Sequence, residues 1–178
     1  MSRVLIWLFF ATLSLTLLLQ LRGLDGPLSA VTPGGIVAYE LAFTAERAKA
    51  ILDVWRSAGV TEQARVSLGV DVGFLLVYPW FFWWSVRVLR TPRFVLPGSN
   101  LHRMGGALGG AVLACIPLDA FENWCLWRMI EEGPSPSLAA LAGMAASLKF
   151  LLVLCTALWC LIALSRRFAN SSSSRTPT

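Results

Sequence analysis

IPLDAFENWCLW, residues 116–127, places Asp119, Glu122 and Asn123 on neighbouring turns of an otherwise apolar run from about residue 104 to 129. At about 100° per residue, these three side chains share one face of a helix. An ionisable residue in a membrane span is costly and usually faces the interior of a helix bundle. We therefore expect other spans to pack around this face and to bring polar residues of their own to it.

The composition agrees with a membrane protein. Of the 178 residues, 56% are hydrophobic and 14% are charged, and the mean hydropathy is +0.66. An ordinary soluble domain has about half apolar and about a quarter charged residues. Most of the eight Trp lie near the ends of apolar runs, which is typical of residues at the membrane interface.

Four apolar runs are long enough to cross a bilayer, at about residues 4–21, 66–89, 104–129 and 138–164. We therefore predict an all-α integral membrane protein in which a four-helix transmembrane bundle forms one domain, residues 1–170. Pro79 should kink the second span, and the polar tail 171–178 should be disordered. The first run is longer than the core of a usual signal peptide and lacks a clear cleavage site, so we expect it to be retained.

The long loop between the first two spans contains helix signals between residues 32 and 58. Thr32 precedes Pro33, a favourable start for a helix, and Thr44 offers a second start. After Thr44, apolar residues recur on one face until Gly59 ends the pattern. The loop therefore predicts one or two short amphipathic helices that lie on the outer membrane surface or cap the bundle.

The arginines indicate the orientation. Counted with the span ends that flank it, the short loop between the second and third spans (87–103) carries four Arg, whereas the loop between the third and fourth carries one, Arg128. The positive-inside rule then places both termini and the loop 87–103 in the cytoplasm. We expect a multi-pass protein of a bacterial inner membrane.

Face and depth together predict a polar cluster in the outer half of the bundle. Asp71 on the second span and Asp119 on the third lie at similar depths, because these spans run in opposite directions. Lys149 lies deeper, and its side chain points toward its own N-terminus and hence toward the carboxylates. Thr12, Thr16 and Gln20 form a polar row on the first span, which we expect to face the same centre of the bundle. We also expect Tyr78, Glu122 and Asn123 to face this centre.

We interpret the cluster as a site that opens to the outer face and binds or acts on a small or lipid-like ligand. Asp119 and Glu122 are the candidates for catalysis, as an acid and base pair. Trp124 and Trp127 are expected to form aromatic walls for a cationic group. The other candidate ligand-binding residues are Asp71, Tyr78, Asn123 and Lys149. The expected partners are membrane lipid and a small or cationic ligand, and whether the protein is an enzyme is left open.

Two other functions remain open. The cluster could be structural, in a non-catalytic membrane subunit or assembly partner, with Gly105 and Gly109 forming a close-packing face for a homo- or hetero-oligomer. Alternatively, the carboxylates could serve a proton- or cation-coupled transporter, although no internal repeat is evident.

Several other classes of function lack support in the sequence. Walker, Rossmann, zinc-protease, serine-hydrolase and haem motifs are all missing. The single histidine, His102, lies in the predicted cytoplasmic loop, and the four cysteines form no C-x-x-C pair. We therefore expect no metal and no cofactor. The basic residues follow membrane topology instead of forming a basic stripe, so we expect no nucleic-acid partner.

Overall fold

The computed structural model describes residues 3–173, and these form helices and connecting turns without a strand. The helices are α1 (Arg3–Val31), α2 (Gly35–Glu40), α3 (Ala45–Ser57), α4 (Thr61–Leu75), α5 (Tyr78–Leu89), α6 (Asn100–Ala111), the 3₁₀ turn η1 (Val112–Ala114), α7 (Cys115–Glu132) and α8 (Pro136–Ser173). Four helical segments are long and apolar enough to cross a membrane: Val4–Val31, Thr61–Leu89, Asn100–Glu132 and Pro136–Arg166. The chain thus fits a multi-pass helical membrane protein, as its sequence predicts.

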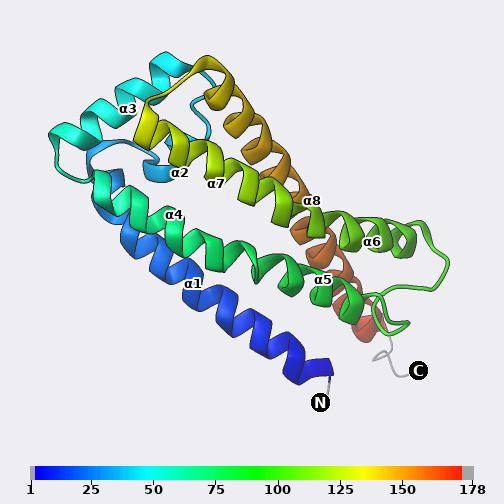
Figure 1. Ribbon diagram of the computed structural model, residues 1–178. Coiled ribbons are helices and arrows are strands. Elements are labelled where there is room, and N and C mark those ends of the chain that lie inside the picture. The colour runs from blue at the N-terminus through cyan, green and yellow to red at the C-terminus, as the bar shows by residue number, and fades with distance from the viewer. Residues whose placement is uncertain (1–2, 174–178) are drawn as a thin grey trace.

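The long helices form a bundle in which α1 packs along α4 and α5, and α7 packs along α8 (Figure 1). Contacts between α4 and α7 join these two pairs. The start of α1 and the end of α8 lie at one end of the bundle, and α2 and α3 lie at the other. We call the end with α2 and α3 the outer end, following the orientation that the arginines predict.

The first helix continues ten residues beyond its predicted end at residue 21, to Val31, and this outer extension positions α2. Asp25 on α1 accepts a hydrogen bond from the backbone nitrogen of Ile36 (2.7 Å) and another from Ser29 (2.6 Å). Gly35 has a φ of +51°, and a Cβ there would lie 2.1 Å from Oδ1 of Asp25, so a side chain is excluded. This contact fixes α2, the helix that carries Glu40 into the bundle.

The two short helices cap the bundle. Thr44 caps α3 by accepting from the backbone nitrogen of Arg47, as predicted, whereas Gly34 and not Thr32 precedes α2. Trp55 on α3 and Tyr39 on α2 are fully buried in a core that also contains Leu126 of α7 and residues of α8. Of the two predicted arrangements, packing against the bundle is therefore the one observed.

The second and third spans are both interrupted, and the interruptions pack together. The second span breaks at Leu76 and Val77, just before Pro79, which confirms the predicted kink. The third passes through η1 before α7 begins at Cys115. Buried Tyr78 packs with Val112 and Cys115 in one cluster. The break thus sets the position of Tyr78 beside the third span.

The polar row predicted on the first span faces away from the bundle. Thr12, Thr16 and Gln20 are exposed, and the hydroxyl of Thr16 donates to the carbonyl of Thr12 (3.0 Å). Because a helical Thr can satisfy its hydroxyl on its own backbone, this row needs no polar neighbour. The prediction that it faces the centre was wrong, and Ser14 on the opposite side of α1 is buried instead.

The predicted glycine face on the third span is occupied within the chain. Gly105 lies against the ring of Trp159 on α8, and Gly109 lies against Val86 on α5. An oligomer through this face stays an untested prediction. At the C-terminal end, α8 continues to Ser173, three residues into the tail expected to be disordered, and residues 174–178 lie outside the described part of the chain.

Candidate functional site

The centre of the site is the ammonium group of Lys149 on α8. Its Nζ lies 2.8 Å from Oδ1 of Asp119 and 2.8 Å from Oε2 of Glu122, both on α7. All three side chains are buried, and that of Glu122 is 0% exposed. The predicted approach of Lys149 to the carboxylates of the third span is therefore present in the structure.

Two further hydrogen bonds join the second span to α7. The hydroxyl of Tyr78 donates to Oδ2 of Asp119 (3.1 Å), so this carboxylate is shared between Tyr78 and Lys149. The side-chain amide of Asn123 donates to Oδ2 of Asp71 (2.7 Å). The structure thus brings together six of the eight residues singled out in the sequence, while their function stays a prediction.

Glu40 is a member of the cluster that sequence analysis missed. It ends α2, its side chain is 12% exposed, and its Oε2 lies 4.0 Å from Nζ of Lys149. In the sequence, Glu40 lies in the long loop between the first two spans and not within an apolar run. One available signal was its place at the C-terminus of a predicted short helix, where the helix dipole disfavours a carboxylate.

A cavity of about 730 Å³ extends from this cluster along α1. Its polar wall contains Glu40, Ser67, Asp71, Asp119 and Lys149, whereas Glu122 is not among the lining residues. The rest of the wall is mainly apolar and comes largely from α1, α4 and α5, including Trp7, Ala11, Leu15, Leu18, Leu21, Phe74, Phe81 and Phe82. The lining runs along α1 from Trp7 to Asp25, which corresponds to about 27 Å of helix.

The cavity opens along the side of the bundle. Leu15 and Leu18 on α1 and Phe150 on α8 line it and are also exposed on the molecular surface. At the outer end, Ile36 and Val37 of α2 form part of the wall. Val37 is itself exposed, so the expected opening at the outer face stays a prediction, beside a rim between α1 and α8 that would face lipid.

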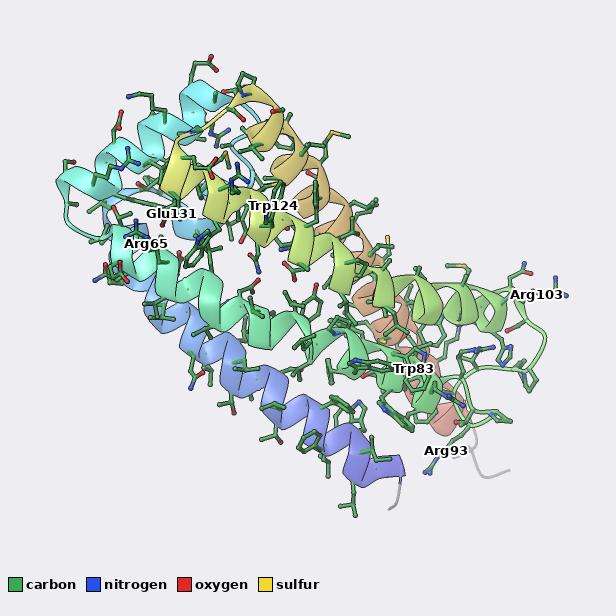
Figure 2. The ribbon with its side chains drawn as sticks, viewed as in Figure 1. Arg65, Trp83, Arg93, Arg103, Trp124 and Glu131 are labelled. Atoms are coloured by element: carbon green, nitrogen blue, oxygen red, sulfur yellow. The ribbon has the colours of Figure 1, made fainter. Side chains whose placement is uncertain are left out.

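Trp124 and Trp127 do not line this cavity. They are exposed on α7, where they border a second groove of about 460 Å³ with Asn123 and with Leu68 and Val72 of α4 (Trp124 is labelled in Figure 2). The expected aromatic wall is therefore on the other side of the contact between α4 and α7. One residue of helix turns a side chain by about 100°, which separates Trp124 from the face of Asn123.

The two ends of the bundle differ in charge, as Figure 2 shows. At the outer end, Arg65 on α4 pairs with Glu131 on α7 (2.7 Å). At the other end, Arg93 lies near the end of α8, and Arg103 lies at the start of α6. This distribution follows the sequence pattern behind the predicted orientation, and the orientation itself stays a prediction.

The chain matches no protein-family model, and no curated protein or solved structure shows significant similarity to it. Among the described residues, no group of three or more His, Cys, Asp or Glu side chains could hold a metal ion. With Lys149 at its centre, the cluster can bind polar groups and move protons, beside an apolar channel.

Burial raises the pKa of Glu40 from its ordinary 4.5 to about 7, against the opposing effect of Lys149. The groups that act on Glu40 are Lys149 from α8, Asp71 from α4, and Asp119 and Glu122 from α7. Between pH 4.5 and 7, the folded protein therefore holds a proton on Glu40 that the unfolded chain releases. The resulting stability is fully present below pH 4.5 and is lost as the pH rises through 7.

We expect Glu40→Gln to weaken the fall in melting temperature between pH 5 and 8. The measurement is thermal unfolding of purified protein in detergent at a series of pH values. Glu46→Gln, at an exposed position of α3, is the matched control. In this variant the melting temperature should change with pH as it does in the wild type. If the melting temperature changes equally with pH in the wild type and in Glu40→Gln, Glu40 titrates in the same way in the folded and unfolded protein.

Proposed function

We propose that this chain is a multi-pass membrane protein that binds a single-chain, lipid-like amphiphile, with its head at the Lys149 cluster and its tail along α1. The observation that carries the proposal is the shape and lining of the cavity of about 730 Å³. Ligand sites are typically apolar pockets with a few convergent polar groups. Here the polar groups gather at one wall, and the apolar wall continues toward Trp7.

The dimensions of the cavity favour a long chain. Trp7 donates to Ser85 (2.8 Å), and Leu17 lies beside Gly73, so α1 and the second span are antiparallel in a defined register. This register places Asp71 about 20 Å from the level of Trp7 along α1. A hexadecyl chain reaches about this far, so its end would lie against the Trp7 ring.

The exposed rim supports entry from the lipid phase. An amphiphile dissolved in a bilayer already has its tail between lipid chains, and a side opening between Leu18 and Phe150 lets it enter without crossing water. In this arrangement the head lies at the polar wall that Glu40, Asp71, Asp119 and Lys149 share. Glu122, which is fully buried beside Lys149, orients the ammonium group and does not touch the ligand.

Filling the cavity tests this proposal. An ω-bromo hexadecanol should quench Trp7 fluorescence in the purified protein, because bromine quenches indole on contact, and the quenching should disappear in Trp7→Phe. We expect Ser14→Phe to abolish saturable quenching, since Ser14 lines the cavity and a phenyl ring would occupy the path of the tail. The matched control is Thr16→Phe on the same helix, where the side chain is exposed and quenching should persist.

Both outcomes are informative. Saturable quenching that survives Ser14→Phe would place the amphiphile outside the cavity. Absence of quenching in the folded wild type would favour the alternative in which the polar cluster has a structural role. Thermal unfolding of each variant, measured in parallel, separates a blocked cavity from a damaged fold.

A further inference from the structure

The carboxyl groups around the cavity outnumber the cations that could pair with them. Lys149 lies within 2.8 Å of both Asp119 and Glu122. Glu40 is farther away, at 4.0 Å, and Asp71 receives the neutral amide of Asn123. Among the described residues no ion pair involves Asp71. Two cavity-lining carboxyl groups are therefore left without a close cation.

The one arginine that lines the cavity does not restore this balance. Arg22 is exposed at the outer rim, and no ion pair of Arg22 with a carboxyl occurs within the described part of the chain. The nearby Asp25 is committed to capping α2 through Ile36 and Ser29. Negative charge thus remains in excess on the polar wall, between α2 and α4.

A second, independent feature on α1 indicates that a ligand belongs here. Ser14 is 8% exposed and lines the cavity, and its hydroxyl oxygen has no hydrogen-bond partner. Serines in helices commonly bond to the carbonyl four residues earlier, as Ser85 does with Phe81. A buried hydroxyl without a partner is destabilising, so a polar atom supplied from the cavity would stabilise it.

Ser14 lies at a defined distance from the carboxyl groups. The antiparallel register of α1 and the second span places it level with the break at Leu76 and Val77. This level is about 9 Å from that of Asp71 along the bundle. A ligand whose head contacts Asp71 therefore extends past the Ser14 hydroxyl on its way to Trp7.

We infer that the amphiphile bound here carries a cationic amine head, with its ammonium group between Asp71 and Glu40 and its chain running past Ser14. This inference rests on the proposed function and adds the chemical class of the ligand. A primary ammonium has three donors and no acceptor, which suits two carboxyl groups that lack a close cation. Hydrogen bonds between ionised partners are shorter and stronger than neutral ones.

The same arrangement predicts how binding depends on pH. Burial raises the pKa of Glu40 to about 7, so this carboxyl is partly protonated at neutral pH. An ammonium group binds best to the ionised carboxylate and therefore releases the proton. The groups that face Glu40 are Lys149, Asp71, Asp119 and Glu122, and Arg22 and Asp25 line the same cavity. Amine affinity should increase between pH 5 and 8.

The experiment compares heads on one tail. The probes are ω-bromo hexadecylamine, the corresponding alcohol and the corresponding carboxylic acid, each titrated against full-length protein in detergent with Trp7 quenching as readout. We expect the amine to bind wild type about tenfold or more tightly than the alcohol, because a charge-assisted hydrogen bond exceeds a neutral one. In the double variant Asp71→Asn, Glu40→Gln, the alcohol should still bind. The amine and the alcohol should then have about equal affinities.

Controls keep the two proposals distinguishable. Asp53→Asn removes an exposed carboxylate of α3 and should retain the amine preference. Equal affinity for amine and alcohol in wild type would overturn the inference about the head and leave the proposed function standing. Tightest binding of the carboxylic acid would also overturn it, since Lys149 would then be the head-group contact. Quenching by none of the probes in folded protein would overturn both.

Discussion

Replacing Lys149 with methionine should lower the free energy of unfolding by about 3–5 kcal/mol, the usual cost of removing one partner from a buried ion pair. Asp119 and Glu122, each 2.8 Å from the ammonium group, would lose their cation while their own side chains stay buried. Their ionised forms would then be strongly disfavoured. Thermal unfolding in detergent measures the effect, which should appear as a large fall in melting temperature.

The chain provides a matched control, because Lys49 and Lys149 are its two lysines. Lys49 pairs with Asp53 on α3, but both side chains are at least half exposed. Exposed pairs contribute little to stability, so Lys49→Met should leave the melting temperature unchanged. Equal shifts for the two variants would contradict a buried, structurally coupled role for Lys149.

Acid should partly rescue Lys149→Met. At low pH the carboxyl groups take up protons and no longer need a cation, so the difference from wild type should shrink as the pH falls. Adding Asp119→Asn and Glu122→Gln to Lys149→Met should recover part of the lost stability at neutral pH. Such recovery would show that the loss comes from uncompensated charge and not from a packing defect.

Helical periodicity and antiparallel depth were sufficient to predict much of the cluster. Asp71, Asp119 and Lys149 lie on three long spans. Because each span must cross the whole bilayer, its length fixes the depth of each of its residues. Long helices keep both face and depth over many residues, so polar residues on them could be matched across the bundle. The structure shows the predicted approach of Lys149 to Asp119.

Glu40 could not be placed in this way. It lies on a six-residue helix whose position depends on the cap that Asp25 forms with Ile36. A short connector has no membrane depth of its own, and its position follows from tertiary contacts. The inward face of α1 was also ambiguous, because Thr16 bonds to its own helix and can face outward, whereas Ser14 does not.

Gly105→Ala should be the most damaging single methyl group that can be added to α6. A Cβ at this position would lie 2.2 Å from Cζ2 and 2.6 Å from Cε2 of Trp159. The indole cannot move away easily, because it is 1% exposed and its Nε1 donates to the carbonyl of Leu101 (2.9 Å). Inserting a methyl group into such packing typically costs about 1–3 kcal/mol, which exceeds the gain of about 1 kcal/mol from replacing a helical glycine.

Gly110→Ala on the same helix is the matched control, because no atom lies within 4 Å of the added Cβ. It should keep or slightly raise the melting temperature through helix propensity alone. The two variants therefore differ in sign, although the chemical change is identical. A neutral Gly105→Ala would show that α6 and α8 are not in close contact at Trp159, and the glycine face would then be free for another subunit. A strong loss at Gly105 with none at Gly110 instead assigns this face to packing within one chain.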